Sequence, residues 1–223
     1  MHLQKGKKVF FYFFLFFLLG SINNIHIKNF KLSKIKTINV SGLDEKNNLF
    51  ILNQIENLNF DSIFKTKTKD IKNIFEENTT IENYQVFKIY PSTIDINIKK
   101  TKFLAQIRNE GKIYFIGSNG KLSKKEVLNK KLPFIFGNPK INEFLEIKKF
   151  IDQSKFSFDQ IENLYFFQSR RWDLELKNKI VIKLPTDNIK NSLDNVFNFI
   201  NDNKSTDIKI LDARVKNQII LNE

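Results

Sequence analysis

"SRRWDLELKNKIVIKLP", residues 169–185, contains the only tryptophan of the chain, and its pattern decides how the second half folds. Trp172, Leu174 and Leu176 alternate with charged side chains. Because successive side chains of a strand point to opposite faces, this pattern predicts an amphipathic strand with the tryptophan on the buried face. A second strand is expected after residues 177–179. The stretch therefore predicts a hairpin of a β-rich fold.

The same stretch allows a second interpretation, because two arginines and an aspartate surround the tryptophan. Such a cluster could contact a phosphate group or a nucleic acid. The alternation favours a structural role instead, with Arg171 and Asp173 on the charged face in a cross-strand ladder. Upstream, the pattern changes register near Gln168 and Ser169, which predicts a bulge or a turn.

Composition limits the chemistry that the chain can perform. Its 223 residues are 41% hydrophobic and include 24 phenylalanines, enough for one large or two small domains. Cysteine is absent, which excludes disulfides and thiolate chemistry. The two histidines, His2 and His26, flank the apolar N-terminal segment, so a histidine triad or metal site in the globular part is excluded. We expect no catalysis, no metal and no cofactor.

The formal net charge of +13 suggests binding to nucleic acid or to an anionic surface. The positive charge comes mostly from lysines scattered along the chain, whereas arginine, the usual reader of phosphates and base edges, is rare. This distribution indicates a compositional bias rather than a binding patch. We therefore expect neither nucleic acid nor a small-molecule substrate as a partner.

Residues 9–19, "VFFYFFLFFLL", form an uncharged apolar run after a short basic head. Each central Phe or Leu favours membrane insertion by about 0.3–0.6 kcal/mol. Extended to residue 27, the run gives about 28 Å of helix, close to the hydrocarbon thickness of ~30 Å. A secretory signal peptide also fits this length, but residues 18–21, Leu-Leu-Gly-Ser, place leucine where a cleavage site has a small residue.

An uncleaved membrane anchor is therefore preferred. We expect a cytoplasmic head over residues 1–8, a single transmembrane helix over 9–27 and a polar tether over 28–34. The remainder of the chain then lies on the outer side of the membrane, the usual outcome for a first helix that leads a large translocated part.

Residues 35–102 predict a domain of β-α-α-β-β order. The expected elements are a strand in "KIKTINVSGL", a helix with a stripe of Ile51, Ile55 and Leu58, a helix over 70–77, and strands in "IENYQVFKIY" and "STIDINIKK". In the last of these, every second residue is isoleucine, so one face of the strand is apolar and the other polar.

Residues 103–223 predict a β-rich domain with two inserted helices. One helix is expected after Asn138-Pro139, with Phe144, Ile147 and Ile151 as its apolar stripe, and a second after Pro185, capped by Thr186 or Asp187. The chain ends in "IKILDARVKNQIILNE", which predicts two strands around Lys216-Asn217. "GSNGK", residues 117–121, lacks the spacing of a phosphate-binding loop, and its Asn-Gly pair predicts a hairpin turn.

Several segments resemble the FtsQ/DivIB family of bacterial cell-division proteins. They are "INVSGL" at 38–43, "VFKIYPSTIDINI" at 86–98, "GKIYFIGSNGKL" at 111–122, "RRWDLELKNKIVIKLP" at 170–185 and "ILDARVKNQIIL" at 210–221. The resemblance implies an α+β protein with a single N-terminal transmembrane helix, a POTRA domain and a β domain. The chain departs from the family at Lys100 and Phe103, where an acidic residue and a proline are usual.

The resemblance also implies a function without catalysis. The family is a single-pass inner-membrane scaffold of the divisome at the septum, and its periplasmic β domain binds the small division proteins FtsB and FtsL through its last strands. A terminal edge strand offers unpaired backbone groups to a partner strand. The partner-binding residues implied here are Val215, Gln218, Ile219, Ile220 and Leu221, with Arg171, Trp172, Asp173, Asp212 and Arg214 in structural roles.

A POTRA domain also occurs in components of outer-membrane protein assembly and secretion, and this is the alternative function. Such a component usually carries further POTRA repeats or a long C-terminal barrel. The sequence predicts one repeat and no barrel, so the division scaffold is preferred.

Overall fold

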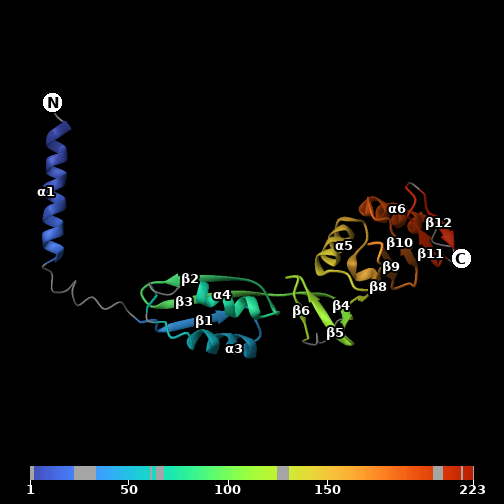
Figure 1. Cartoon of the computed structure of the whole chain (residues 1–223), viewed down its shortest axis with the longest axis horizontal. Coiled ribbons are helices and arrows are strands. Elements are labelled where there is room, and N and C mark those ends of the chain that lie inside the picture. The colour runs from blue at the N-terminus through green and yellow to red at the C-terminus, as the bar shows by residue number, and fades with distance from the viewer. Residues whose placement is uncertain are drawn as a thin grey trace.

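The computed structural model of the chain describes residues 3–22, 34–60, 62–63, 68–124, 131–202, 208–216 and 218–222. Within these residues the fold is a mixed α+β arrangement with two separate sheets, each covered by a pair of helices (Figure 1). The first sheet has three strands and the second has nine. Each sheet has a hydrophobic core of its own.

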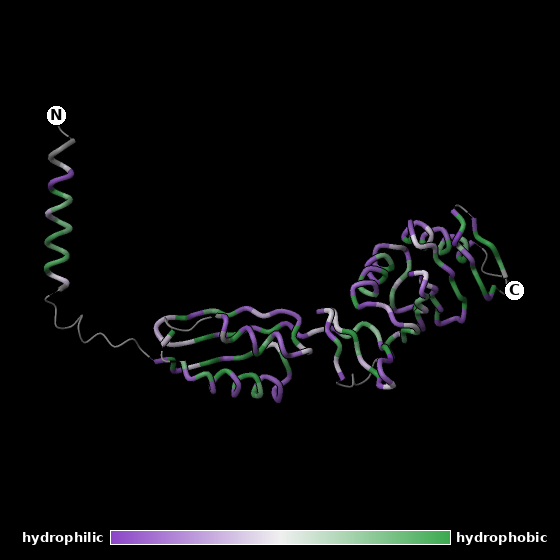
Figure 2. Tube along the Cα trace, in the orientation of Figure 1, coloured by the Kyte–Doolittle hydropathy of each residue, from purple (hydrophilic) through white to green (hydrophobic). Residues whose placement is uncertain are grey.

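Helix α1 (Leu3–Ile22) includes most of the apolar N-terminal run, which Figure 2 shows as a green stretch. Among the described residues, no helix combines the length and the apolar content needed to cross a membrane. The span predicted over 9–27 is therefore not confirmed. Its last residues, 23–27, lie outside the described part of the chain, as do 1–2 of the predicted head and 28–33 of the tether.

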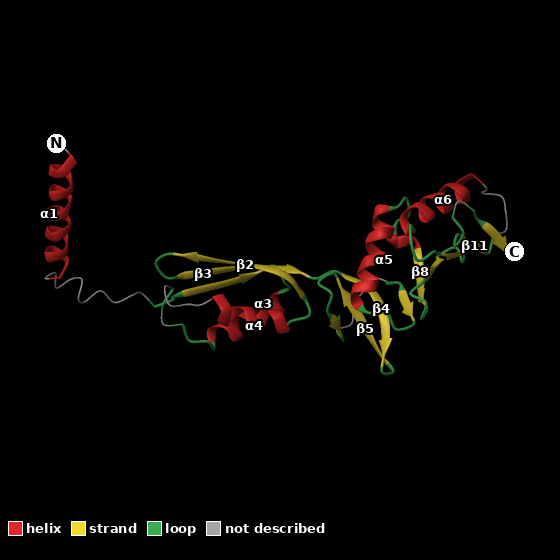
Figure 3. Cartoon of the chain, turned by 45° about the horizontal axis from the view of Figure 1, so that its top comes forward, coloured by secondary structure: helices red, strands yellow, loops and turns green. Residues whose placement is uncertain are grey.

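The three-stranded sheet consists of β1 (Thr37–Ser41), β2 (Ile81–Ile89) and β3 (Thr93–Lys100) in the order β1-β3-β2. Strand β1 runs parallel to the central β3, and β2 runs antiparallel to it. Helices α3 (Glu45–Glu56) and α4 (Thr68–Glu77) lie on one face of this sheet (Figure 3). The predicted β-α-α-β-β order is confirmed.

The core of this unit follows the periodicity of the sequence. Ile94, Ile96 and Ile98 of β3 are buried and belong to the same hydrophobic cluster as Ile51 and Ile55 of α3. Because alternate residues of β3 share a face, a single strand supplies the centre of the core while its polar residues stay on the opposite face.

Gly42 makes the end of β1 possible. Its φ of +106° is a conformation that side chains rarely adopt. A Cβ atom at this position would lie 1.8 Å from the carbonyl oxygen of Ile98. Only glycine therefore allows the chain to leave β1 so close to β3.

The nine-stranded sheet has the order β12-β11-β10-β9-β8-β7-β4-β5-β6. Its strands are β4 (Phe103–Asn109), β5 (Lys112–Gly117), β6 (Leu122–Ser123), β7 (Phe134–Phe136), β8 (Ile161–Phe166), β9 (Trp172–Leu176), β10 (Val181–Lys183), β11 (Ile210–Asp212) and β12 (Ile220–Asn222). The pairs β4–β7, β7–β8 and β10–β11 are parallel, and the other pairs are antiparallel.

Helices α5 (Ile141–Gln153) and α6 (Ile189–Asp202) cover one face of the nine-stranded sheet (Figure 3). The predicted stripe of α5 is confirmed, because Phe144, Ile147 and Ile151 are buried in the core. From α6, Leu193 and Val196 are buried in the same core, and Ile189, Phe197 and Ile200 pack against it while partly exposed.

The helix starts differ from the prediction. Helix α5 begins at Ile141 with Lys140 at its N-cap, where the backbone N–H of Lys140 donates to the Glu143 carboxylate. The predicted start at Asn138-Pro139 was therefore too early. Helix α6 begins at Ile189, directly after Asn188 in a left-handed conformation, so neither Thr186 nor Asp187 precedes it directly.

The predicted apolar stripe of α3 included Leu58, which lies outside the helix. The helix ends at Glu56, and the N–H of Asn57 donates to the Asn53 carbonyl at its C-terminus. Leu58 lies beyond this end and is 38% exposed. Helical spacing in the sequence continues past the point where the helix stops.

The quoted stretch forms the hairpin that its alternation predicts. Strand β9 buries Trp172, Leu174 and Leu176, and β10 pairs with it antiparallel. The ring of Trp172 lies 4.8 Å from that of Phe166, centroid to centroid. The register change upstream is a turn, in which Arg170 has a φ of 62°.

Candidate partner-binding edge

Strand β12 is the last strand of the nine-stranded sheet at its C-terminal end (Figure 1). It pairs antiparallel with β11, so that Ile210 faces Asn222, Leu211 faces Leu221 and Asp212 faces Ile220. Among the described residues, no strand pairs with its other side. Its outer N–H and C=O groups are therefore available to a further strand.

The side chains of the predicted partner-binding residues gather at this edge. Val215 is 47% exposed, Ile220 52% and Leu221 47%. Gln218 is also exposed, whereas Ile219 is half-buried and packs against the sheet core. Ile220 and Leu221 thus belong to β12, whereas Val215, Gln218 and Ile219 lie in the connection before it.

The connection between β11 and β12 is held at both ends. The N–H of Ala213 donates to the carbonyl of Lys183 (3.0 Å), which continues the parallel ladder past β11. The N–H of Gln218 donates to the carbonyl of Val215 (3.2 Å). Asn217 of the predicted turn lies outside the described residues. These bonds join the start of the connection to β10 and close a turn before β12.

A small cavity of about 280 Å³ lies between α6 and this connection. Ser192 and Asn195 line it from the helix, and Ala213, Val215, Gln218 and Ile219 line it from the connection. Neither helix residue was predicted from the sequence, where only the start of this helix after Pro185 was considered. Their signal was a polar pair three residues apart on the other side of the helix.

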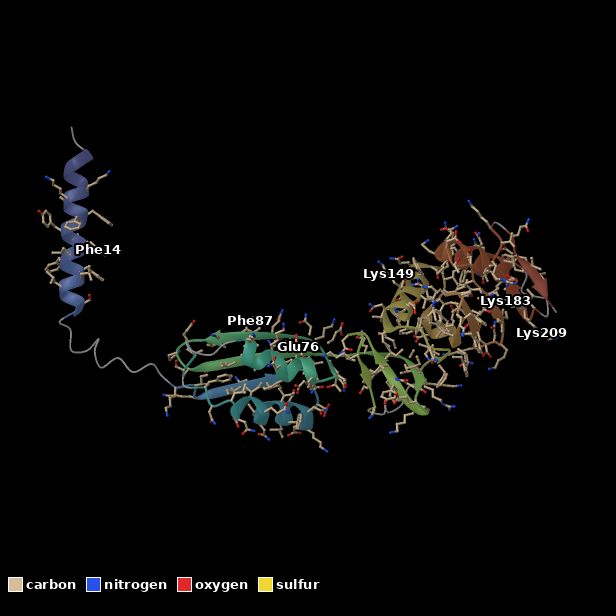
Figure 4. The ribbon with its side chains drawn as sticks, viewed as in Figure 1. Phe14, Glu76, Phe87, Lys149, Lys183 and Lys209 are labelled. Atoms are coloured by element: carbon tan, nitrogen blue, oxygen red, sulfur yellow. The ribbon has the colours of Figure 1, made fainter. Side chains whose placement is uncertain are left out.

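A row of charges crosses the open face of the sheet, opposite the helices, and ends at the edge strand. In register across three strands, the row consists of Asp173, Lys183 and Asp212, and Ile220 of β12 is the next residue in register. Lys183, labelled in Figure 4, stands between the two carboxylates, so each carboxylate has a cation as its cross-strand neighbour.

Two arginines complete this row, each paired with a carboxylate two residues away in its own segment. The Nε of Arg171 lies 3.1 Å from Oδ1 of Asp173, two residues along the same chain. The Nε of Arg214 donates to both carboxylate oxygens of Asp212 (2.8 and 2.9 Å), again two residues apart. Arg171 therefore pairs with Asp173 along the chain, whereas Asp173 itself belongs to a cross-strand ladder of the kind expected. Lys183 is the cross-strand partner of Asp173.

The pKa values of Asp173 and Asp212 shift in opposite directions. The hydrogen bond from Arg214 lowers the pKa of Asp212 below its usual value. Burial raises the pKa of Asp173, and this effect exceeds the opposing attraction of Arg171, Lys183 and Arg214. The guanidinium of Arg214 remains half-exposed. The edge therefore presents an accessible cation beside the apolar side chain of Ile220.

A second polar cluster on the open face was not predicted. Glu175 accepts hydrogen bonds from the hydroxyl of Tyr165 (2.7 Å) and the amide of Asn163 (2.8 Å). Burial and the bond to this carboxylate raise the pKa of Tyr165 to about 12. Its ring stacks on Phe136 at 4.9 Å. All members have partners within the sheet, and among the described residues no cluster could hold a metal ion.

Sequence comparisons define the class of protein first. The family model "POTRA domain, FtsQ-type" matches residues 33–100, the three-stranded unit, and "Cell division protein FtsQ/DivIB, C-terminal" matches residues 105–214. The chain thus has a POTRA domain followed by an FtsQ-type domain. It belongs to the FtsQ/DivIB family of cell division proteins. The second match ends at Arg214, just before the segment that leads to β12.

Two individual sequence relatives agree with this assignment. The cell division protein FtsQ of Rickettsia bellii is 26% identical over 203 residues, which cover 85% of this chain and 71% of the relative. The cell division protein DivIB of Staphylococcus aureus is 28% identical over 93 residues, 42% of this chain and 21% of that protein. The major extracytoplasmic domain of DivIB from Geobacillus stearothermophilus matches with 11% identity and a TM-score of 0.35, covering 47% of this chain and 94% of the solved one.

Proposed function

We propose that the chain is a non-catalytic scaffold of the bacterial divisome, anchored in the inner membrane by a single N-terminal helix. Residues 1–8 are then cytoplasmic, 9–27 cross the membrane and 28–34 form the tether. The POTRA domain at 35–102 and the β domain at 103–223 lie in the periplasm at the septum. Family membership and the apolar run of α1 support this arrangement.

The scaffold captures its partners, division proteins of the FtsB and FtsL type, through the edge of β12. The observation that carries this proposal is an edge strand whose outer side pairs with no strand among the described residues and which exposes Ile220 and Leu221. A strand of the partner adds to the sheet by main-chain hydrogen bonds, and the exposed apolar side chains supply contact area. The half-exposed Arg214 favours a partner strand with an acidic residue nearby.

Co-purification of the full chain with an FtsB/FtsL complex tests the edge. Ile220→Lys places a charge in the middle of the contact, and we expect it to weaken capture at least tenfold, about 1.4 kcal/mol. Removal of residues 218–223 should abolish capture, because the edge strand itself is lost. Normal capture by the truncated protein would rule out β12 as the docking strand.

Ile113→Lys is the matched control. Ile113 is 47% exposed and lies on β5 of the same sheet, away from β12. The same change of charge there should leave capture unaltered. Equal losses at Ile113 and Ile220 would indicate a general charge effect rather than a docking edge.

Depletion in cells separates the division scaffold from the alternative role in outer-membrane assembly. The scaffold predicts long undivided filaments, together with a fluorescent fusion that gathers at the septum. Intact division with a defective outer membrane would instead support the alternative. A membrane-fractionation experiment on the same cells tests the anchor, since the proposal requires the full chain in the inner-membrane fraction.

A further inference from the structure

The hairpin tip at residues 117–121 contacts the POTRA domain rather than solvent alone. The amide nitrogen of Asn119 donates to the carbonyls of Thr79 (3.1 Å) and Ile81 (2.8 Å). The amide oxygen of the same side chain accepts from the N–H of Lys121 (3.0 Å). One side chain therefore fixes the turn of the β domain and binds the backbone of the POTRA domain at the same time.

Lys121 reaches the C-terminal end of α4. Its ammonium lies 2.6 Å from the carbonyl oxygen of Glu76 and 3.5 Å from those of Phe75 and Asn78. The last carbonyls of a helix lack partners within the helix and carry the negative end of its dipole, so they attract a cation. A lysine of the second domain thus caps a helix of the first.

Further bonds hold the connection between the domains. The hydroxyls of Thr79 and Ser123 are 3.1 Å apart, and Ser123 is only 2% exposed. Lys102, between β3 and β4, donates from its N–H to the hydroxyl of Ser118 (3.1 Å) and accepts at its carbonyl from the N–H of Ser118 (2.8 Å). The short connection of residues 101–102 is therefore held by the hairpin tip.

Glycine suits the tip for two reasons, namely close packing at Gly117 and a left-handed conformation at Gly120. A Cβ atom on Gly117 would lie 2.5 Å from the amide oxygen of Asn119 and 2.7 Å from the methyl carbon of Thr101. Gly120 has a φ of +73°, and a Cβ there would lie 3.6 Å from Leu145 of α5. The tip thus contacts the POTRA domain on one side and a helix of the β domain on the other.

We infer that the hairpin tip is a latch that joins the POTRA and β domains into one rigid arm. Two domains joined by two residues normally move relative to each other, because few contacts cross the boundary. Here the contacts come from Asn119, Lys121 and Ser123, and their acceptors are mostly backbone carbonyls that keep their positions. The latch acts within the chain and holds whether or not β12 binds a partner.

Pulsed electron double resonance on the purified full chain tests the latch. The sequence contains no cysteine, so spin labels attach only where cysteines are introduced, at Gln85→Cys on β2 and Lys149→Cys on α5. Both positions are exposed, and Lys149 is labelled in Figure 4. We expect one narrow distance distribution between the labels. A broad distribution in the protein without latch substitutions would overturn the inference.

Substitutions in the latch give the second arm of the test. Lys121→Met keeps the length of the side chain without its charge, and Asn119→Asp keeps the turn-forming oxygen without the donor. Together they should at least double the width of the distance distribution. An unchanged width would show that the latch does not fix the domains.

Two controls separate mobility from unfolding. Lys112→Met removes an exposed lysine at the other end of β5 and should leave the distribution unchanged. The fluorescence of Trp172, buried in the β domain, should keep its emission maximum in all variants. A latch variant with broadened distances and an unshifted maximum has mobile but folded domains, as the inference requires.

Discussion

Asp212 is the residue at which the charged row meets the docking edge. Its pKa is lowered in the folded protein because Arg214 donates hydrogen bonds to it. A lowered pKa means that the folded state favours the ionised carboxylate, so its contribution to stability is present above the unfolded pKa of about 4. This contribution is lost as the pH falls through the lower pKa of the folded state.

We therefore expect Asp212→Asn to be destabilising at pH 7 and less destabilising near pH 2, below the unfolded pKa. The expected loss at pH 7 is about 1 kcal/mol, because solvent screens the half-exposed Arg214. Urea denaturation at both pH values measures it. Asp202→Asn, at the exposed C-terminal end of α6, should cost nothing at either pH. Equal losses for Asp212→Asn at both pH values would contradict an ionic contribution.

At the scale of single residues, the sequence predicted which face of a strand a side chain occupies better than it predicted which side chains interact. Alternation placed Trp172 on the buried face, and the structure confirms this. It also placed Arg171 and Asp173 on the opposite face in a cross-strand ladder, but it did not identify Lys183 as the cross-strand neighbour of Asp173. Which groups meet across strands depends on the register of β9 and β10 and on side-chain rotamers, and a single strand contains neither piece of information.

At the scale of elements, the junction of β1 with β3 depends on Gly42. We expect Gly42→Ala to destabilise the POTRA domain by about 3 kcal/mol or more, because a Cβ would clash with the backbone of Ile98 in addition to the strain at positive φ. Denaturation followed by circular dichroism measures the loss.

Gly111→Ala is the control for this prediction. Gly111 also has a positive φ, 77°, but nothing lies within 4 Å of a Cβ at that position. It should therefore show only the conformational cost, about 1–2 kcal/mol. If the two alanines cost the same, the close approach of β1 to β3 has no energetic importance.

Elements with a clear period were predicted well, and elements defined by distant partners were not. The alternation of β3 and the stripes of α4 and α5 suffice to identify them. Strand β7 has three residues, and its parallel neighbours β4 and β8 are far away in the sequence. The Asn119-Gly120 turn was predicted correctly, but its contacts with the POTRA domain were not, because backbone carbonyls have no sequence signature.

At the candidate site, too, the local element was predicted from the sequence but its contacts with a distant element were not. The sequence predicted a terminal edge strand over 218–221, and the structure places β12 at Ile220–Asn222 on the edge of the sheet. The lining of the adjacent cavity by Ser192 and Asn195 depends on how α6 packs, which no local pattern contains.

At the scale of the whole molecule, we expect the chain to stay folded when β12 is removed. Removal of 218–223 deletes a strand of three residues that contacts only β11 in the sheet. The half-buried Ile219 and the pair of Leu221 with Leu211 suggest a loss of roughly 1–2 kcal/mol. Thermal and urea unfolding of the truncated chain measure it.

Ile182→Ala provides the contrast for this measurement. Ile182 is fully buried in β10, in the middle of the same sheet, and its truncation should cost about 2–5 kcal/mol. A truncated chain that loses more stability than this variant would make β12 part of the core rather than a docking element. The loss of partner capture by the truncated chain would then reflect unfolding and would not identify β12 as the docking strand.

The two ends of the nine-stranded sheet differ, and this difference limits how copies of the chain can assemble. At one end, β12 offers an open edge. At the other, β6 is two residues long, and its Ser123 is buried against Thr79 of the POTRA domain. Head-to-tail growth of a filament needs two complementary ends on every subunit. Because β6 offers so few main-chain groups, we expect strand addition at β12 and not at β6, and addition at one end alone does not propagate into a polymer.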